Sequence, residues 1–354
     1  MATPQKKYEV ELWVNDVLIA DISHLAQQLK WRKQRNEAES CSFSLDLVAF
    51  EQYAESINQH PRTLLDSYIT DVKLKRNGEY LLGCQVVQVT PTFNQAGASL
   101  DIRADGYLNL FVDRYVTISF DDIESTEIAN ALLVETQSET NGDFGVDEGP
   151  LQYTTGVERV RQYVRENVKE ELQNLTELVT GGFDFEFTHD KKFNTYASLG
   201  SDREDVVLTY PGNVETMTAP RNGQTIFNHI DGIGSGFGDE AITSTADDAV
   251  SQMTYKRREL PLSFNGVSLQ NTLDQKTDAE LDKRRDILQL PQMTINGELF
   301  DLSDLSVGDR PVLVVKGHPY IDNIDGLYRI EVIDVTVDEN ESEAITLTFD
   351  DYGL

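Results

Sequence analysis

The sequence has few basic side chains for its length. It contains 30 Lys and Arg residues against 61 Asp and Glu residues, so the 354-residue chain carries a net charge of −31. Proteins that bind DNA stably hold its phosphates with clustered Lys and Arg. The densest basic cluster here, Lys256, Arg257 and Arg258, is followed at once by Glu259. We therefore expect the chain to repel nucleic-acid phosphate.

Long apolar runs are also absent. No run approaches the roughly 18 residues that a membrane-spanning helix needs, and the opening residues MATPQKKYEVELWV lack the apolar core of a signal peptide. Neither membrane insertion nor signal-peptide export is expected. The two cysteines, Cys41 and Cys84, each lie in an apolar stretch. We expect buried free thiols, with a single disulfide as the alternative.

Motifs of known chemistry are missing. The spacings of zinc-protease helices, hydrolase nucleophile elbows, Walker loops and EF-hands do not occur. With so many acidic residues, pairs such as Asp121-Asp122 and Asp350-Asp351 are inevitable and indicate no acid/base site. We predict no catalytic residue, no cofactor-binding residue, no metal ligand and no enzymatic activity. The five histidines are scattered singly along the chain: His24, His60, His189, His229 and His318.

Two polar loops are the remaining candidate sites. Residues 232–240 include Gly234, Gly236 and Gly238, but the spacing of these glycines is not that of a dinucleotide-binding loop, and Asp239-Glu240 would repel phosphate. Residues 137–150 carry oxygen donors of the kind that Ca²⁺ prefers. Because these donors lack a regular calcium-loop spacing, the sequence leaves calcium binding undecided. The donors are Asn141, Asp143, Asp147 and Glu148.

The first 115 residues predict one antiparallel β domain. Apolar and polar residues alternate from Tyr8 and again from Cys41. Asn77-Gly78 stands between two strand-like runs, which is the strongest short-range hairpin signal because both residues tolerate positive φ. Asn15-Asp16 predicts another hairpin, and a short helix is predicted at 50–57.

Residues 116–255 predict an α+β middle domain. Ser125 can cap a helix. From Thr155 to Val179 the apolar residues step by three or four, which predicts a long amphipathic helix that ends at Gly181-Gly182. Strand-like alternation returns at Phe183 and at residues 206–210.

Residues 256–354 predict a second β domain. A polar helix is expected within 262–285, with turns at Asn265-Gly266 and Asn296-Gly297. Three strand runs follow at 311–316, 327–337 and 344–349. The two ends of the chain thus share a pattern of strands, although their residues do not form a sequence repeat.

Several segments resemble the hub-type minor tail proteins of long-tailed phages. They cover most of the chain and match as turns and alternating residues: 29–43, KLKRNGEYLLGCQVV at 73–87, TELVTGGFDFEF at 176–187, SLGSDREDVVLTYPGN at 198–213, 305–309 and 326–330. The resemblance implies a tail or baseplate hub with two tube-like antiparallel β-barrel domains flanking the central α+β domain. In that family, three subunits form a pseudo-sixfold ring between a sixfold tail tube and a threefold tip.

The resemblance also implies the surroundings of the protein. The expected partners are two further copies of the chain, tail tube and distal tail proteins, and a fibre or spike, with DNA only in transit. The expected location is the virion tail tip. The sequence stops at Leu354 after its last predicted strand, so we expect receptor binding and wall cleavage on other chains. The loops at 137–150 and 232–240 are candidate contacts with neighbouring tail proteins, with plain surface loops as the alternative.

The acidic composition leads to two hypotheses. Molar salt shortens the Debye length to about 3 Å and removes charge self-repulsion, so the composition fits a salt-loving host and a haloarchaeal tailed virus; an ordinary acidic protein is the alternative. Asp and Glu on the strands of the two β domains would give the channel a negative wall. Two other functions stay open: an oligomeric tail-tube or secretion-needle-type structural protein, and a cell-wall-degrading tail enzyme.

Overall fold

The chain forms two compact units in the computed structural model, which describes residues 7–350 apart from 96, 179, 222, 237, 265–266, 287–290, 298–300 and 322. The first unit combines Met1–Met217 with Gln292–Leu354, and the second is Thr218–Pro291. The second unit spans residue 255, and the division into three domains at 115 and 255 stays a prediction. No helix among the described residues is long and apolar enough to cross a membrane.

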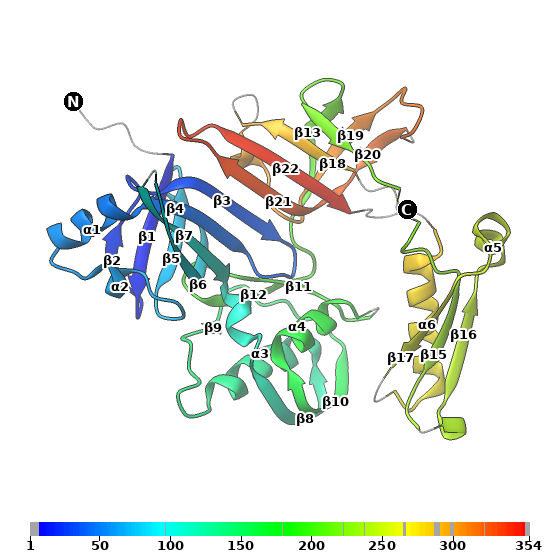
Figure 1. Ribbon diagram of the computed structural model, residues 1–354. Coiled ribbons are helices and arrows are strands. Elements are labelled where there is room, and N and C mark those ends of the chain that lie inside the picture. Colours follow the sequence, from blue (N-terminus) through cyan, green and yellow to red (C-terminus); the bar gives the residue numbers. More distant parts are fainter. Residues whose placement is uncertain are drawn as a thin grey trace. The chain divides into compact units, whose positions relative to one another are not determined.

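One antiparallel sheet of eleven strands organises the first unit (Figure 1). It is open at both ends, and no closed barrel occurs among the described strands. The strands in sheet order are β14 (Thr216–Thr218), β18 (Gln292–Asn296), β22 (Glu343–Asp350), β21 (Arg329–Val337), β3 (Gln27–Gln34), β4 (Ser40–Asp46), β7 (Gly97–Gly106), β6 (Glu79–Asn94), β5 (Asp71–Arg76), β1 (Tyr8–Val14) and β2 (Val17–Asp21).

We call β1–β7 with their helices the N-terminal lobe. The hairpins predicted at Asn15-Asp16 and Asn77-Gly78 are confirmed, and all four residues have positive φ. The predicted short helix is confirmed as α1 (Leu47–Ser56), which Asp46 caps by accepting a hydrogen bond from the Ala49 amide. The other helix of this lobe is α2 (Pro61–Leu64), and η1 (Tyr107–Phe111) after β7 begins the middle lobe.

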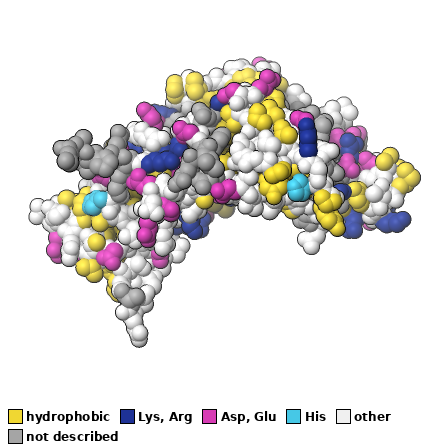
Figure 2. Space-filling view, turned by 90° about the horizontal axis from the view of Figure 1, so that it is seen from above, with side chains coloured by type: hydrophobic (Ala, Val, Ile, Leu, Met, Phe, Trp, Pro, Cys, Tyr) yellow, Lys and Arg dark blue, Asp and Glu magenta, His cyan; other side chains and the backbone are white. Residues whose placement is uncertain are grey.

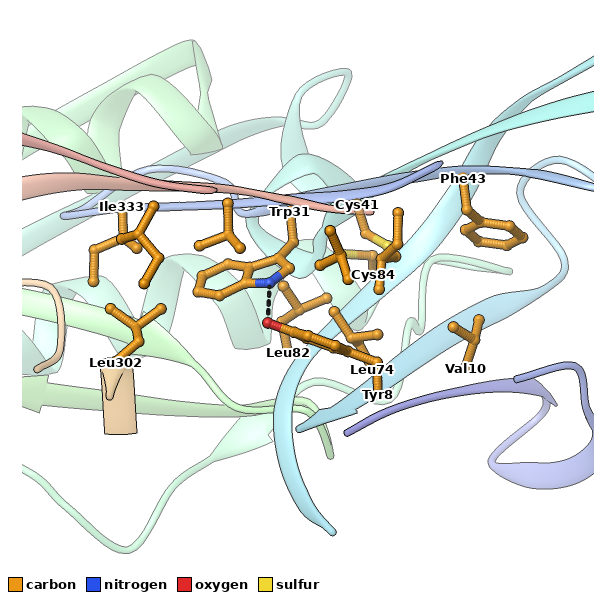
Figure 3. Packing of buried hydrophobic residues seen from close by; sticks show 14 of the residues in the cluster. Tyr8, Val10, Trp31, Cys41, Phe43, Leu74, Leu82, Cys84, Leu302 and Ile333 are labelled. Atoms are coloured by element: carbon orange, nitrogen blue, oxygen red, sulfur yellow. Dashed lines mark hydrogen bonds between the residues drawn. The ribbon is translucent and has the colours of Figure 1, made fainter. Parts of the chain in front are cut away.

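The C-terminal lobe packs a second sheet against β14, β18, β21 and β22. This sheet has the order β13-β19-β20 and comprises β13 (Asp202–Tyr210), β19 (Arg310–Val315) and β20 (Ile324–Leu327), with η3 (Leu302–Asp304) beside it. Apolar side chains of the two lobes form one continuous core. Figure 3 shows part of it, where Leu302 and Ile333 of the C-terminal lobe lie near Trp31 of the N-terminal lobe.

The middle lobe, residues 107–196, contains the clearest failure of the sequence prediction. The helix expected from Thr155 is wrong in its first half, because Glu158–Asn167 is strand β10 and only Val168–Thr176 is helix α4. Two register shifts in β10 disturb its alternation and produce the helix-like spacing. Val160 and Val164 are exposed rather than core residues, and β-branched side chains favour strands.

The rest of the middle lobe agrees better with prediction. Strand β8 (Tyr115–Glu124) pairs with β10, and the helix predicted from Ser125 is confirmed as α3 (Ser125–Gln137). The alternation after Phe183 is confirmed as β11 (Asp184–Phe187), which pairs with β12 (Lys192–Tyr196), and β12 pairs with β9 (Asp147–Glu148). This lobe has its own core, rich in phenylalanine.

The second unit is a three-stranded sheet covered by one helix. The strands have the order β16-β15-β17, namely β16 (Thr243–Asp247), β15 (His229–Ile233) and β17 (Glu259–Ser263), with η2 (Gly238–Glu240) and α5 (Ala249–Tyr255) between them. The predicted polar helix is confirmed as α6 (Gln270–Arg284). The turn predicted at Asn265-Gly266 lies outside the described residues.

Candidate functional site

Seven neighbouring strands of the large sheet carry a surface that we call the polar face. Two rows of cross-strand partners define it. The first row takes one residue from each of β18, β22, β21, β3, β4, β7 and β6, namely Thr294, Thr346, Asp334, Arg32, Ser40, Asp105 and Gln85; the second runs from β22 to β6 and is Ala344, Thr336, Lys30, Ser42, Arg103 and Gln88. Successive side chains on a strand point to opposite faces, so their neighbours Trp31, Cys41 and Ile102 are buried in the core.

Hydroxyl and amide side chains dominate the polar face, and its charges nearly balance. Lys30 and three arginines, Arg32, Arg103 and Arg329, stand against five aspartates on the same face of the strands: Asp46, Asp101, Asp105, Asp334 and Asp350. The carboxylate-rich channel wall stays a prediction, and on this face the aspartates outnumber the basic side chains only slightly. Elsewhere, Asp and Glu are dispersed, and Figure 2 shows scattered acidic side chains rather than one continuous acidic patch.

Each arginine of the polar face is held by an aspartate of the same face. Arg32 Nη1 lies 3.2 and 2.9 Å from the two carboxylate oxygens of Asp334. Arg103 donates from Nε and Nη2 to the two oxygens of Asp105, at 3.1 Å each. Arg329 Nη2 donates to Asp350 at 2.9 Å. Arg103 thus makes two parallel hydrogen bonds to its carboxylate, whereas Arg32 contacts both oxygens of Asp334 from a single nitrogen. Each pairing compensates the charge of the guanidinium locally.

The pairing of β3 with β21 joins the two lobes into one sheet. Lys33 lies opposite Ile333, and Trp31 lies opposite Val335. Immediately after β3, Arg35 donates from Nε to Glu331 at 2.9 Å and from Nη1 to Asp184 of the middle lobe at 2.6 Å. The end of β3 is thus the point at which all three lobes of the first unit meet.

A buried ionic network at Glu343 fixes the same joint on the core side. Glu343, on β22, is 3% exposed and receives two hydrogen bonds from Arg76, at 2.7 and 2.9 Å. It also accepts from the Tyr8 hydroxyl at 2.5 Å and lies 3.0 Å from Lys7 Nζ. Burial alone would raise the pKa of Glu343, but the hydrogen bonds from Arg76, Tyr8 and Lys7 outweigh burial and lower this pKa.

The outer half of β6 is an open edge of the sheet. Strand β5 covers β6 only as far as Gln85, whereas β7 pairs with it to Asn94. Three large apolar side chains are exposed beside this edge. Phe93 lies near the end of β6, and Tyr68 and Ile69 lie near Val86, whose carbonyl oxygen accepts a hydrogen bond from the Tyr68 amide. A groove of about 1080 Å³ runs along the edge, with Leu47, Phe50 and Val89 among its lining residues. Such an edge can accept another strand.

A partly open cavity of about 530 Å³ is lined by residues of the N-terminal, middle and C-terminal lobes. Lys33 and Glu39 face each other across it, with 3.1 Å between Nζ and Oε1. Burial raises the pKa of Glu39, although the ammonium of Lys33 opposes this. Two serines are among the lining residues: Ser303 on η3, whose hydroxyl oxygen accepts a hydrogen bond from Arg76 Nη1 at 2.6 Å, and Ser306 after it, whose amide donates to Asp309.

The residues singled out from sequence do not converge on a chemical site. The Gly145 amide binds Asp143, and Lys192 binds Asp147 at 2.6 Å. No group of three or more His, Cys, Asp or Glu residues suited to a metal ion occurs in the described part of the chain. The loop at 232–240 is closed by backbone hydrogen bonds from Gly234 and Ser235. Cys41 and Cys84 are buried and free, as predicted.

One histidine cluster escaped the sequence prediction. In the second unit, His229 Nδ1 lies 2.8 Å from Asp247 and Nε2 lies 2.9 Å from Arg257 Nη2. Asp231 Oδ1 also lies 3.2 Å from Nε2. These residues come from β15, β16 and the segment before β17, so no local spacing in the sequence reveals them. No nucleophile completes the cluster, which ties three segments together.

No family model matches the chain, and no curated protein is similar to it in sequence. Solved structures are similar. The 43 kDa tail protein of prophage MuSo2 from Shewanella oneidensis has 12% sequence identity and a TM-score of 0.67, with 97% of this chain and 98% of that chain covered. The tail protein from Neisseria meningitidis MC58 has 13% identity and a TM-score of 0.67, with 98% of both chains covered.

A secretion protein shares the fold more distantly. It is a component of the Escherichia coli type VI secretion system, described as similar in structure to the T4 bacteriophage tail proteins gp27 and gp5. It has 12% identity and a TM-score of 0.51, with 97% of this chain and 77% of that chain covered. At these identities the likeness concerns the fold. The chain therefore has the fold of the baseplate hub-type tail proteins of phages.

Proposed function

We propose that the chain is a structural tail hub subunit, three copies of which form a ring at the virion tail tip. The pairing of β3 with β21 carries the proposal, because it places four strands of each lobe side by side in one sheet: β6, β7, β4 and β3, then β21, β22, β18 and β14. Three copies would supply six such sets of four strands. That arrangement suits a sixfold tail tube on one side and a threefold fibre or spike on the other.

In this proposal, the two lobes act as the tube-like β-barrel domains, and the barrel closes only between copies. The residues predicted as tube-like domains are 1–115 and 256–354, with 116–255 between them. The open edge at β6, with Phe93, Tyr68 and Ile69, would pair with the β14 end of the next copy. A head-to-tail contact of unlike surfaces closes a ring when its rotation fits. The polar face then lines the channel, through which DNA passes without being bound.

The size of the assembly tests the proposal. Mass photometry and electron micrographs of the full chain should show rings of three subunits. Phe93→Ser combined with Tyr68→Ser should shift the population towards monomers, because it removes apolar area at the open edge. Met253→Ser, which changes a 74% exposed side chain in the second unit, is the control and should leave the rings intact. A chain that remains monomeric at every concentration and on tail tubes would contradict the proposal.

A second structural role is favoured by the similarity to the type VI secretion component. In that case the chain would belong to a secretion spike or needle rather than to a virion. Fractionation distinguishes the two: a hub subunit should sediment with DNA-containing tailed particles, whereas a spike subunit should appear without them. A six-subunit or helical assembly would favour a tube protein. Turnover of a wall polymer by the purified chain would favour the remaining alternative, a tail enzyme.

The salt-loving host is a separate proposal with its own test. The chain has a net charge of −31, and its excess carboxylates repel one another at low salt, because the Debye length grows from about 3 Å at 1 M to about 30 Å at 0.01 M. A protein adapted to high salt should lose its circular dichroism signal as sodium chloride is removed. A fold that is indifferent to salt over this range would remove the haloarchaeal assignment and leave the hub proposal unchanged.

A further inference from the structure

The arginines of the polar face are paired in a way that bears on how DNA meets this surface. Arg103 and Asp105 belong to the same strand, and the Arg103 side chain is 63% exposed. Arg32 and Asp334 face each other across the β3–β21 joint, with exposures of 43% and 39%. The Arg32–Asp334 pair and the Arg103 guanidinium are therefore in contact with solvent, whereas the Asp105 side chain is only 12% exposed and also accepts a hydrogen bond from Asn109 Nδ2 at 3.3 Å.

We propose that Asp105 and Asp334 mask Arg103 and Arg32 from the DNA backbone, so that the polar face forms a charge-compensated track for duplex DNA. The inference rests on the proposed function, in which this face lines the channel. A guanidinium that is paired with a carboxylate has its positive charge locally compensated, and it attracts phosphate less than an unpaired guanidinium does. Hydroxyl and amide groups occupy the positions between the pairs. The track then neither holds nor strongly repels a moving duplex.

Local charges, rather than the net charge of the chain, decide this interaction. At 0.1 M salt the Debye length is about 10 Å, so a phosphate at the polar face senses the rows of this face and little of the remote acidic surface. Within the two rows, Lys30, Arg32 and Arg103 stand against Asp105 and Asp334. Asp101 and Asp46 lie farther along β7 and β4 on the same face. Removing Asp105 and Asp334 would leave Lys30, Arg32 and Arg103 on neighbouring strands without the carboxylates that are paired with the two arginines. These two aspartates would therefore contribute most to preventing a phosphate-binding patch.

The experiment compares the full chain with its Asp105→Asn and Asp334→Asn double variant on duplex-DNA cellulose. The unaltered chain should elute without retention at 0.1 M sodium chloride. The double variant should be retained, and its affinity should fall with salt with a log–log slope that is steeper by about two, because two more phosphates are contacted at roughly 0.9 each. Adding Arg32→Gln and Arg103→Gln to the double variant should abolish the retention.

A matched control exists in another sheet. Arg203 and Asp205 on β13 have the same spacing as Arg103 and Asp105, and their closest oxygen and nitrogen atoms lie 2.8 Å apart. Asp205→Asn removes the same charge away from the polar face and should not cause retention. Retention by this variant to the same extent would overturn the inference, because loss of net charge alone would then explain the binding.

A single variant serves as the control for loss of folding. Asp105→Asn breaks a pair within one strand and leaves the β3–β21 joint intact, so it should preserve the circular dichroism spectrum and give about half of the increase in slope. A folded double or single variant that elutes like the unaltered chain would overturn the inference. The proposed channel role is tested separately. If the variants are retained but the chain is monomeric, the ring is contradicted, whereas the masking of the arginines is still supported.

Discussion

The Tyr8 hydroxyl donates a hydrogen bond to Oε1 of Glu343, which lies 335 positions later in the sequence, with 2.5 Å between the two oxygen atoms. The same hydroxyl oxygen accepts a hydrogen bond from Trp31 Nε1 at 3.1 Å, which Figure 3 shows within the packed apolar core. One phenol thus connects the first strand of the N-terminal lobe with a strand of the C-terminal lobe. Burial raises the pKa of Tyr8, and its hydrogen bond to the Glu343 carboxylate adds to the rise. The phenol therefore stays protonated and remains a donor.

Replacing this phenol should destabilise the first unit. Tyr8→Phe leaves the Trp31 indole N–H without its acceptor and Glu343 without one donor, and an unsatisfied buried polar group costs about 1–3 kcal/mol. We expect the free energy of unfolding to fall by about that amount in a urea titration. Tyr68→Phe is the control, because Tyr68 is 71% exposed, and it should change the stability very little. Equal stability of the two variants would show that the buried hydroxyl contributes nothing.

Glu343 should give the first unit a specific sensitivity to acid. Its folded-state pKa is lowered, so its contribution is fully present above the unfolded value of about 4.3 and is lost as the pH falls through the folded value. Glu343→Gln should therefore cost about 3 kcal/mol at pH 7, as expected for breaking a buried ion pair. The difference from the unaltered chain should shrink below pH 4. A difference that stays constant between pH 7 and pH 3 would contradict this assignment.

Two facing glycines make the loop before β13 intolerant of side chains. A Cβ at Gly200 would lie 2.1 Å from the Gly308 carbonyl carbon, and Gly200 has a φ of +74°. Gly200→Ala should cost roughly 2–5 kcal/mol, which combines the left-handed backbone with overpacking. Gly317→Ala is the matched control, because Gly317 has a φ of +80° but no atom within 4 Å of the added Cβ. It should cost only about 1–2 kcal/mol, as measured by denaturant unfolding.

The contact between the middle and N-terminal lobes should weaken as histidine becomes protonated. The His189 ring stacks on Tyr80 with 4.0 Å between ring centroids. Burial lowers the pKa of His189 despite the opposing charge of Asp190, and nearby lysines lower it further. Its stabilising contribution is then fully present above the unfolded value of about 6.5 and is lost as the pH falls towards the lower folded value.

Hydrogen exchange at residues 184–196 can measure this loss. Protection should be weaker at pH 5 than at pH 7.5 once intrinsic exchange rates are corrected for. His189→Phe keeps an aromatic ring that does not titrate, so it should reduce the change in protection between the two pH values. An unchanged pH dependence in this variant would assign the effect to another group.

Local patterns in the sequence predicted the elements whose cause is local. Asn77-Gly78 adopts positive φ and closes the β5–β6 hairpin, because turn geometry depends on those two residues alone. The short helix predicted at 50–57 also has a local cause, because Asp46 caps α1 through the amide of Ala49, three positions away. The burial of Cys41 also followed from strict alternation along β4. These features require no information about distant residues.

The features that matter most for function were not predictable in this way. The polar face appears only when β3 and β21 pair, and nothing near Arg32 indicates that Asp334 is its partner. Glu343 looks like one acidic residue among many, because its three partners lie in the first quarter of the chain. The strand β10 was mistaken for a helix because its bulges imitate helical spacing. Tertiary pairing decides all three cases.

The β3–β21 pairing also constrains how the protein is made. During synthesis, β3 leaves the ribosome about 295 residues before β21, which at 5–20 residues per second is a delay of roughly 15–60 s. For that period β3 has one side without its final partner, and an unpaired strand edge invites aggregation. Charged side chains protect such edges, and β3 carries Lys30, Arg32 and Lys33. Until β21 is synthesised, the charges of these basic residues should disfavour pairing of the uncovered β3 edge with strands of other chains.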